Sequence, residues 1–139
     1  MRESLFENMV KSAGDAIVFA DKEGVIRVWN RGAEKIFGYS EAETLGESLD
    51  IIIPEKMREN HWNGYTRAME SGRTKYEGKL MPTKAIKKDG GSIYVEMSLT
   101  IIRDDTETKG ALAIMRDITE RWLNEKEMKK RLEELESRK

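Results

Sequence analysis

The only histidine of this 139-residue chain, His61, lies on an apolar helix face rather than among charged residues. Between Pro54 and Gly72 the side chains of this face recur at steps of four, four, three and one, which is the spacing of one side of an α-helix. They are Met57, His61, Tyr65, Ala68 and Met69. Gly64 lies close to the same face and would leave room for a flat, bulky group beside His61. An imidazole in such a place can ligate a metal ion or exchange a proton near neutral pH.

A purely structural interpretation also fits these residues, and a single histidine is weak ground for a ligand site. His61 would then be a partly buried, hydrogen-bonded histidine. Gly64 would be tolerated in the helix, or would let another backbone approach, at a cost of about 1 kcal/mol relative to alanine. The residues alone leave both interpretations open.

The helix that carries His61 is predicted to have Pro54 in its first turn, where proline loses no intrahelical hydrogen bond, and to end at Gly72. Around it, apolar periodicity and turn residues predict the other elements. In chain order we expect a helix over residues 1–14, a hairpin over 15–29, short helices over 31–37 and 40–46, and strands over 73–86, 93–102 and 110–118. The fold class is therefore α+β, with one antiparallel sheet of about five strands and short helices over one face.

Residues 120–139 are highly charged, with Glu and Lys or Arg at helical offsets. Met128, Leu132 and Leu135 follow one another at steps of four and three, the spacing of a coiled-coil seam. The seam is shorter than two heptads. The segment is therefore either a solvated helix or a helix that pairs with a partner.

Composition excludes several classes of function. The chain has no cysteine, so it has no disulfide, no iron–sulfur cluster, no Cys-ligated zinc and no thiol nucleophile. One histidine without cysteine also leaves no familiar catalytic triad, and we expect no enzymatic activity. The net charge of −1 gives no general attraction to nucleic acid. No apolar run reaches the length of a membrane span and residues 1–10 do not form a signal peptide, so we expect no membrane segment and a cytoplasmic location.

Five motifs together resemble the pattern of a PAS domain, from about residue 10 to residue 121. They are Val28-Trp29-Asn30, Ile36-Phe37-Gly38-Tyr39-Ser40, Ile53-Pro54-Glu55, Lys88-Asp89-Gly90 and Met115-Arg116-Asp117-Ile118-Thr119-Glu120-Arg121. The resemblance implies the PAS fold, a sensory function in signal transduction and an output helix after the last strand. We accordingly divide the chain into an N-terminal flanking helix (1–14), a PAS sensor domain (15–119) and a C-terminal signalling helix (120–139).

Within the PAS family, the stretch around His61 is similar to the haem-binding oxygen sensors of the FixL and Dos type. The shared residues are Pro54-Glu55, Arg58 three residues before His61, Tyr65 and Arg67. This resemblance implies that haem b binds with His61 as the proximal iron ligand, Tyr65 on the proximal wall and Arg67 beside a propionate. It also implies that Met97 and Leu99 line the distal pocket.

One departure from those sensors concerns the gas that is sensed. They carry an arginine on the distal strand that hydrogen-bonds bound O2, but the matching residue here is Met81. Methionine cannot donate a hydrogen bond, whereas its thioether can ligate iron. We therefore expect Met81 as a second iron ligand that CO or NO displaces, or that responds to redox state. Lys79 is expected on the same strand face, where Dos-type sensors carry a methionine ligand.

The resemblance also implies partners: an output domain such as a histidine kinase, and a second copy in a homodimer formed through the flanking helices. Two other interpretations remain open. The domain can be free of haem and bind a small organic ligand, with His61 and Arg67 holding a carboxylate. It can also bind no ligand and serve as a dimerisation module.

Overall fold

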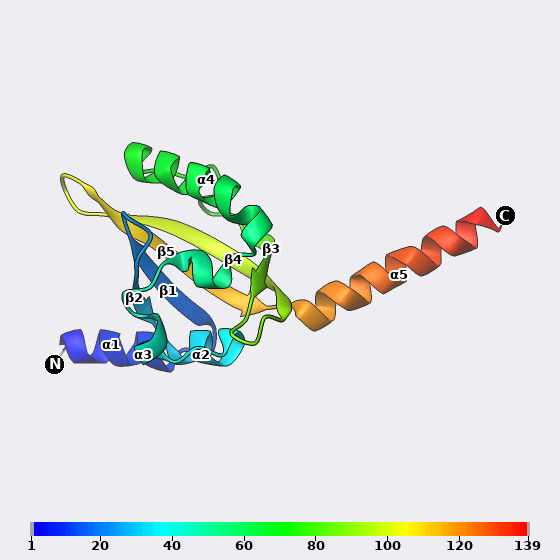
Figure 1. Cartoon of the computed structure of the whole chain (residues 1–139), viewed down its shortest axis with the longest axis horizontal. Coiled ribbons are helices and arrows are strands. Elements are labelled where there is room, and N and C mark those ends of the chain that lie inside the picture. Colours follow the sequence, from blue (N-terminus) through cyan, green and yellow to red (C-terminus); the bar gives the residue numbers. More distant parts are fainter. Residues whose placement is uncertain (1, 139) are drawn as a thin grey trace.

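Five antiparallel strands form one sheet in the spatial order β2-β1-β5-β4-β3 (Figure 1). The computed structural model describes residues 2–138. The strands are β1 (Ala16–Asp21), β2 (Ile26–Trp29), β3 (Met81–Ile86), β4 (Ser92–Arg103) and β5 (Thr108–Asp117). The helices are α1 (Arg2–Ser12), α2 (Arg31–Phe37), α3 (Glu41–Thr44), α4 (Arg58–Ser71) and α5 (Thr119–Ser137), with 3-10 helices η1 (Leu49–Ile52) and η2 (Glu55–Met57). The predicted α+β class and the five-stranded antiparallel sheet are confirmed.

Asn30 joins α1, β1 and α2, and its side chain is buried although it is polar. Its Oδ1 accepts hydrogen bonds from the backbone N–H groups of Ile17 at 2.8 Å and Ala33 at 3.0 Å. Its Nδ2 donates to the carbonyl oxygens of Val10 at 2.9 Å and Asp15 at 3.0 Å. The bond to Ala33 caps the N-terminus of α2. One amide therefore satisfies backbone groups of three elements.

Helix α4, which carries His61, begins later than predicted. Pro54 precedes η2, and α4 starts only at Arg58. The Arg58 guanidinium donates to the backbone carbonyls of Ile53 at 3.0 Å and Asp50 at 3.1 Å. Ile53, which precedes the proline, has an extended backbone with ψ 121°, and Pro54 has ψ 138°, so η1 ends there and α4 begins only after the 3-10 turn of η2. The predicted end at Gly72 is confirmed, since this glycine adopts the left-handed conformation with φ 74°.

Small side chains line much of the sheet face that α4 covers. Three registered pairs between β1 and β5 face α4: Ala16 with Met115, Val18 with Ala113 and Ala20 with Ala111. Four of these six residues are alanine, so the middle of the sheet contributes little side-chain volume. Larger core residues, including Trp29 and Phe37, pack at the end near α2.

The predicted strand over residues 73–86 is wrong in its first half. β3 contains only Met81–Ile86, and residues 73–80 form a loop held by backbone turn hydrogen bonds. Gly78 in this loop has a positive φ of 77°, a conformation that interrupts an extended strand. Lys79 is consequently an exposed loop residue and does not share a strand face with Met81.

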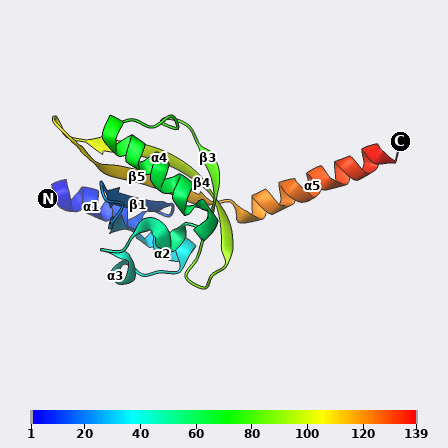
Figure 2. The same cartoon turned by 45° about the horizontal axis from the view of Figure 1, so that its top comes forward.

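Helix α5 extends away from the sheet at the end of β5 (Figures 1 and 2). At its base the Trp122 ring stacks on Tyr94 of β4, with ring centroids 4.9 Å apart, and Arg121 pairs with Glu96 of β4 at 2.8 Å. None of the residues of α5 is buried. Among residues 2–138, no helix combines the length and the apolar composition that crossing a membrane requires. The division of the chain at residues 14 and 119 stays a prediction.

Candidate functional site

A cavity of about 640 Å³ lies between α4 and the inner face of the sheet. All six residues that the sequence analysis selected line it. They are His61, Tyr65 and Arg67 from α4, Met81 from β3, and Met97 and Leu99 from β4. The structure therefore brings together residues that are up to 38 positions apart in the sequence (99 − 61).

The cavity exists because small residues stand on both of its walls. Ala20, Ala111 and Ala113 line it on the sheet side. On the helix side, a Cβ added to Gly64 would meet no atom within 4 Å. Gly64 therefore does not admit another backbone, and that part of the structural interpretation is wrong. The space beside His61 is open.

His61 is half-buried and packs its ring against two aromatic neighbours on α4. Its ring centroid lies 4.6 Å from Trp62 and 5.6 Å from Tyr65. Its Nδ1 is buried and has no hydrogen-bond partner among residues 2–138. Burial lowers the pKa of His61 below 6.5, although the carboxylate of Asp50 opposes the shift. The lowered pKa favours the neutral imidazole, which is the form that can ligate a metal.

Tyr65 forms a fixed part of the wall. Its hydroxyl donates to the carbonyl oxygen of Asp21 at 2.5 Å, with the carbonyl oxygen of Ala20 at 3.2 Å. Burial raises the pKa of this hydroxyl well above 10, so the phenol stays protonated as a donor. Tyr65 therefore ties the middle of α4 to the end of β1 and presents only its ring to the cavity.

A second connection holds the N-terminal half of α4, and the sequence analysis missed it. Trp62 Nε1 donates to Asp50 Oδ1 at 2.7 Å. The Trp62 ring also lies over the turn at Gly24, where an added Cβ would come within 2.2 Å of it. Because Asp50 also orients Arg58 through its backbone carbonyl, these residues fix the His61 turn relative to η1. No local sequence motif predicts these contacts, because they depend on the path that the chain takes after β2.

The charge of the lining has one sign. Arg67 and Lys75 line the cavity, and none of the described Asp and Glu residues does. Within the described chain neither cation forms an ion pair: Arg67 Nε donates to the Asn63 carbonyl at 3.3 Å, and Lys75 Nζ lies 5.0 Å from the Tyr76 ring centroid. Lys84 also borders the cavity, but strand alternation from Ala85 turns its side chain to the other face. The site suits an apolar molecule that carries an anionic group.

The sheet side of the site carries thioethers. Met81 pairs with Met97 across β3 and β4, and Met97 pairs with Met115 across β4 and β5. All three line the cavity. The sequence analysis missed Met115, although its alternation with Ala111 and Ala113 along one strand was a usable signal.

The residues present fit a haem group. No group of three or more His, Asp or Glu side chains gathers into a metal site within residues 2–138, but a haem iron needs only one or two protein ligands. Neutral His61 and the thioether of Met81 are ligands of the right type, and the apolar walls with Arg67 suit a porphyrin with carboxylates. The unpaired Nδ1 opposes this fit, because a ligating histidine normally donates its other N–H to an acceptor. Leaving that buried donor without an acceptor costs about 1–3 kcal/mol.

A family model described as the PAS fold matches residues 4–118. The chain belongs to the PAS family. This PAS chain is 26% identical over 136 residues to the sensor protein FixL of Bradyrhizobium diazoefficiens, covering 98% of the chain and 26% of FixL. It is 28% identical over 100 residues to the oxygen sensor protein DosP of Escherichia coli, covering 72% of the chain and 12% of DosP. The crystal structure of a PAS domain from Colwellia psychrerythraea matches with a TM-score of 0.74 at 26% identity, covering 86% of this chain and 99% of that one.

The PAS resemblance, including its leaning toward FixL and DosP, is thereby confirmed. PAS domains are sensory modules of signalling proteins, and this chain is one of them. It spans about a quarter of FixL and about an eighth of DosP. The activities of those whole proteins therefore come to this chain only as proposals.

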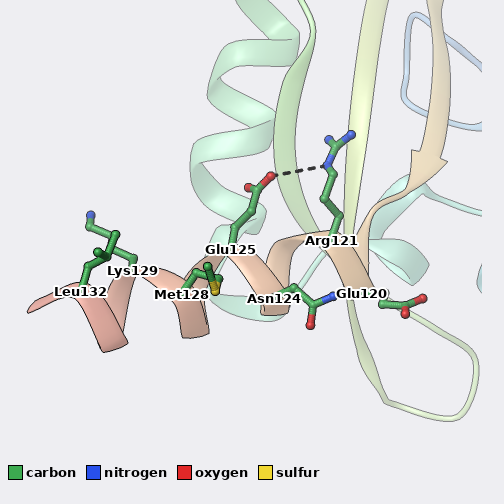
Figure 3. A pocket seen from close by; sticks show the side chains of 7 residues that line it. All are labelled: Glu120, Arg121, Asn124, Glu125, Met128, Lys129 and Leu132. Carbon is green, nitrogen blue, oxygen red and sulfur yellow. Dashed lines mark ion pairs between the residues drawn. The ribbon is translucent and has the colours of Figure 1, made fainter. Parts of the chain in front are cut away.

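A second hollow lies along α5 and is open to solvent (Figure 3). Its lining comes from one side of the helix: Glu120, Arg121, Asn124, Glu125, Met128, Lys129 and Leu132. An ion pair joins Arg121 and Glu125 at 4.0 Å. A surface made by a single exposed helix suits a helical partner better than an enclosed small molecule.

Proposed function

We propose that this PAS domain binds haem b in the cavity under α4, with His61 as an iron ligand, and that it senses a diatomic gas or the redox state. One observation carries the proposal. The only histidine of the chain lines an apolar cavity of about 640 Å³, opposite Met81, Met97 and Leu99, in a chain similar to FixL and DosP. When bound, the iron would supply the centre at which CO, NO or O2 binds or an electron is held.

Each lining residue has a defined part in this proposal. His61 is kept neutral by burial, as ligation requires. Tyr65 is anchored to β1 and forms the proximal wall. Arg67 is the cation for a propionate. Met97 and Leu99 bound the distal side, where they exclude water.

Met81 decides which ligand is favoured. It offers a thioether where an O2 sensor needs a hydrogen-bond donor, so the distal side does not stabilise bound O2. We infer that Met81 would be the second protein ligand of the iron, and that CO, NO or a change in redox state would displace it. Lys79 no longer competes for this position, because it lies in the exposed loop before β3.

Strand β4 connects the cavity to α5. Its inward residues Val95 and Met97 line the cavity, while the outward residues Tyr94 and Glu96 hold Trp122 and Arg121 of α5. A shift of β4 caused by a ligand in the cavity would therefore also move the contacts that hold α5 on the opposite face of the sheet. The proposed output domain, such as a histidine kinase, would follow α5 in a cytoplasmic protein, and a homodimer would form through α1 and α5.

Titration of the purified chain with haemin tests the proposal. We expect a Soret band at one haem per chain and a six-coordinate ferrous spectrum. His61→Ala should lose the ligated spectrum, whereas Glu59→Ala, an exposed change on the same helix that does not border the cavity, should retain it. Met81→Leu should give a five-coordinate ferrous form.

Two outcomes would contradict these assignments. A folded wild-type chain without a Soret band removes haem. A Met81→Leu variant with an unchanged six-coordinate spectrum removes Met81 as a ligand.

A small organic acid is the second candidate ligand. The presence of Arg67 and Lys75 in a lining without any carboxylate favours it, because a carboxylate on an apolar body would meet both requirements of the cavity. Dodecanoate serves as a test ligand for this candidate. If the chain binds no haemin, and dodecanoate raises the melting temperature of the wild type but not that of Arg67→Gln, an organic acid is the supported ligand. If neither ligand binds, the unliganded dimerisation module is what remains.

A further inference from the structure

Three methionines stand side by side on the inner face of the sheet. Met81 of β3 faces Met97 of β4, and Met97 faces Met115 of β5 in the strand register. We call these three residues the methionine row. Each borders the cavity, and Met115 is 4% exposed. A haem would use only one of them.

The strand register allows the three sulfur atoms of the row to come within reach of one another. Adjacent strands lie about 4.8 Å apart, and residues paired across them have Cβ atoms about 4.5–5.5 Å apart. A methionine side chain has three rotatable bonds and adapts to its surroundings. The two outer thioethers can therefore lean toward the central one and meet at a single point on the cavity floor.

The chemistry of the row selects one kind of cation. Thioether sulfur is a soft, neutral donor, and among biological ions it prefers Cu(I). Hard cations such as Mg²⁺ or Ca²⁺ need oxygen ligands, and no Asp or Glu lines the cavity. The chain also has no cysteine, so no thiolate competes for a soft ion. A monovalent ion is also the least costly charge to place among neutral ligands.

We propose that the methionine row binds one Cu(I) ion in the haem-free protein through the thioether sulfurs of Met81, Met97 and Met115. The ion enters and leaves as Cu(I), so no electron is transferred. This site goes beyond the haem proposal and does not depend on it. The two uses exclude each other if Met81 also ligates the haem iron.

An anaerobic competition titration with Cu(I) and bicinchoninate tests this site on the full, haem-free chain. We expect the protein to withdraw one equivalent of Cu(I) from the chelator. Met97→Leu should weaken Cu(I) binding at least about tenfold, as losses around metal sites commonly do. Met115→Leu should do the same. Leucine is close to methionine in volume and shape, so both variants should remain folded, which circular dichroism verifies.

Two methionines outside the row provide matched controls. Met69 is buried on α4 and does not border the cavity, and Met128 is exposed on α5. Met69→Leu and Met128→Leu should bind Cu(I) as the wild type does. X-ray absorption of the Cu(I) complex should show sulfur neighbours only.

Three results would overturn the proposal: no Cu(I) withdrawn from bicinchoninate, equal binding by folded Met97→Leu and wild type, or nitrogen and oxygen neighbours around the bound ion. None of them bears on whether haem binds. Conversely, failure of the haemin titration leaves the Cu(I) experiment intact.

Discussion

His61 lines the cavity and has a pKa below its ordinary value, two properties that support the proposed ligand role. Its Nδ1 is covered by protein, its ring stands against two aromatic neighbours, and burial holds its pKa below 6.5. The lowered pKa keeps the imidazole neutral in mildly acidic solution, where an exposed histidine would take up a proton. Ligand binding through this ring should therefore persist to lower pH than an unperturbed histidine allows.

The same pKa predicts how stability depends on pH. Below pH 6.5, His61 takes up a proton more readily in the unfolded chain than in the folded chain, so the unfolded state binds more protons. The free energy of unfolding therefore decreases as the pH is lowered. His61→Gln should remove the contribution of this group to the loss of stability at low pH. Urea unfolding between pH 7.5 and about pH 5 measures it, because the lowered pKa values of Asp21, Glu43 and Asp104 act only at lower pH. Equal slopes in wild type and His61→Gln would show that the ring is solvated.

Gly64 gives a second prediction for a single residue. An added methyl group meets no atom within 4 Å, and alanine is the better helix former. Gly64→Ala should therefore raise the free energy of unfolding by about 0.5–1 kcal/mol. It should also weaken haemin binding, because the methyl group enters the space beside His61. A gain in stability with unchanged haemin affinity would mean that the haem does not reach this part of α4.

At the residue scale, helical periodicity predicted His61 and Tyr65, and the family resemblance added the other lining residues. His61, Tyr65 and Arg67 were found from one helical stretch and its resemblance, and the structure places them on the same cavity as Met81, Met97 and Leu99. Trp62, Asp50 and Met115 were missed. The contacts of the first two depend on how the chain returns over the turn at Gly24, and Met115 gains meaning only from cross-strand register.

At the scale of the elements, the Asn30 side chain joins α1, β1 and α2 through hydrogen bonds to their backbone groups. Asn30→Ala would leave the part-buried backbone N–H of Ile17 and the buried backbone N–H of Ala33 without this acceptor. We expect a loss of about 3 kcal/mol in the free energy of unfolding, measured by chemical denaturation. Ser40→Ala, which removes the exposed cap of α3, is the matched control and should cost about 1 kcal/mol. Equal losses for the two variants would contradict the connecting function of Asn30.

Element types were predicted well where a strong period or a stop signal was present. The hairpin of β1 and β2, the end of α4 at Gly72 and the strands β4 and β5 follow apolar alternation and glycine positions. The predicted strand over residues 73–86 was wrong in its first half. Tyr76 and Leu80 suggested a strand, but the positive φ of Gly78 and the turn hydrogen bonds of residues 74–79 form a loop instead. The predicted start of α4 at Pro54 was wrong because Ile53 and Pro54 have extended backbone, and α4 begins at Arg58.

On the scale of the whole molecule, the apolar sides of α1 and α5 have no packing partner within residues 2–138. Met128, Leu132 and Leu135 of α5 are 58–60% exposed, and neither helix has a buried residue. An isolated helix in water is marginal without such packing. The proposed homodimer through both helices would cover these surfaces, including the hollow in Figure 3.

Sedimentation velocity over a range of concentrations tests the homodimer. We expect a dimer for the wild type and a shift to monomer for Leu132→Glu, which places a charge in the seam. Lys130→Glu, two residues away on the other side of α5, should remain dimeric. A wild-type chain that is monomeric at all concentrations, or equal dimerisation of both variants, would refute the proposed interface.

A ligand in the cavity should contact the His61 ring, and the single histidine lets one measurement test this contact. Selective 15N-histidine labelling reports on this residue alone, because the chain contains no other histidine. With one equivalent of haem in the diamagnetic ferrous CO state, we predict a large shift of the Nε2 signal while Nδ1 keeps its proton. Unchanged ring nitrogen signals in the folded protein would contradict the account.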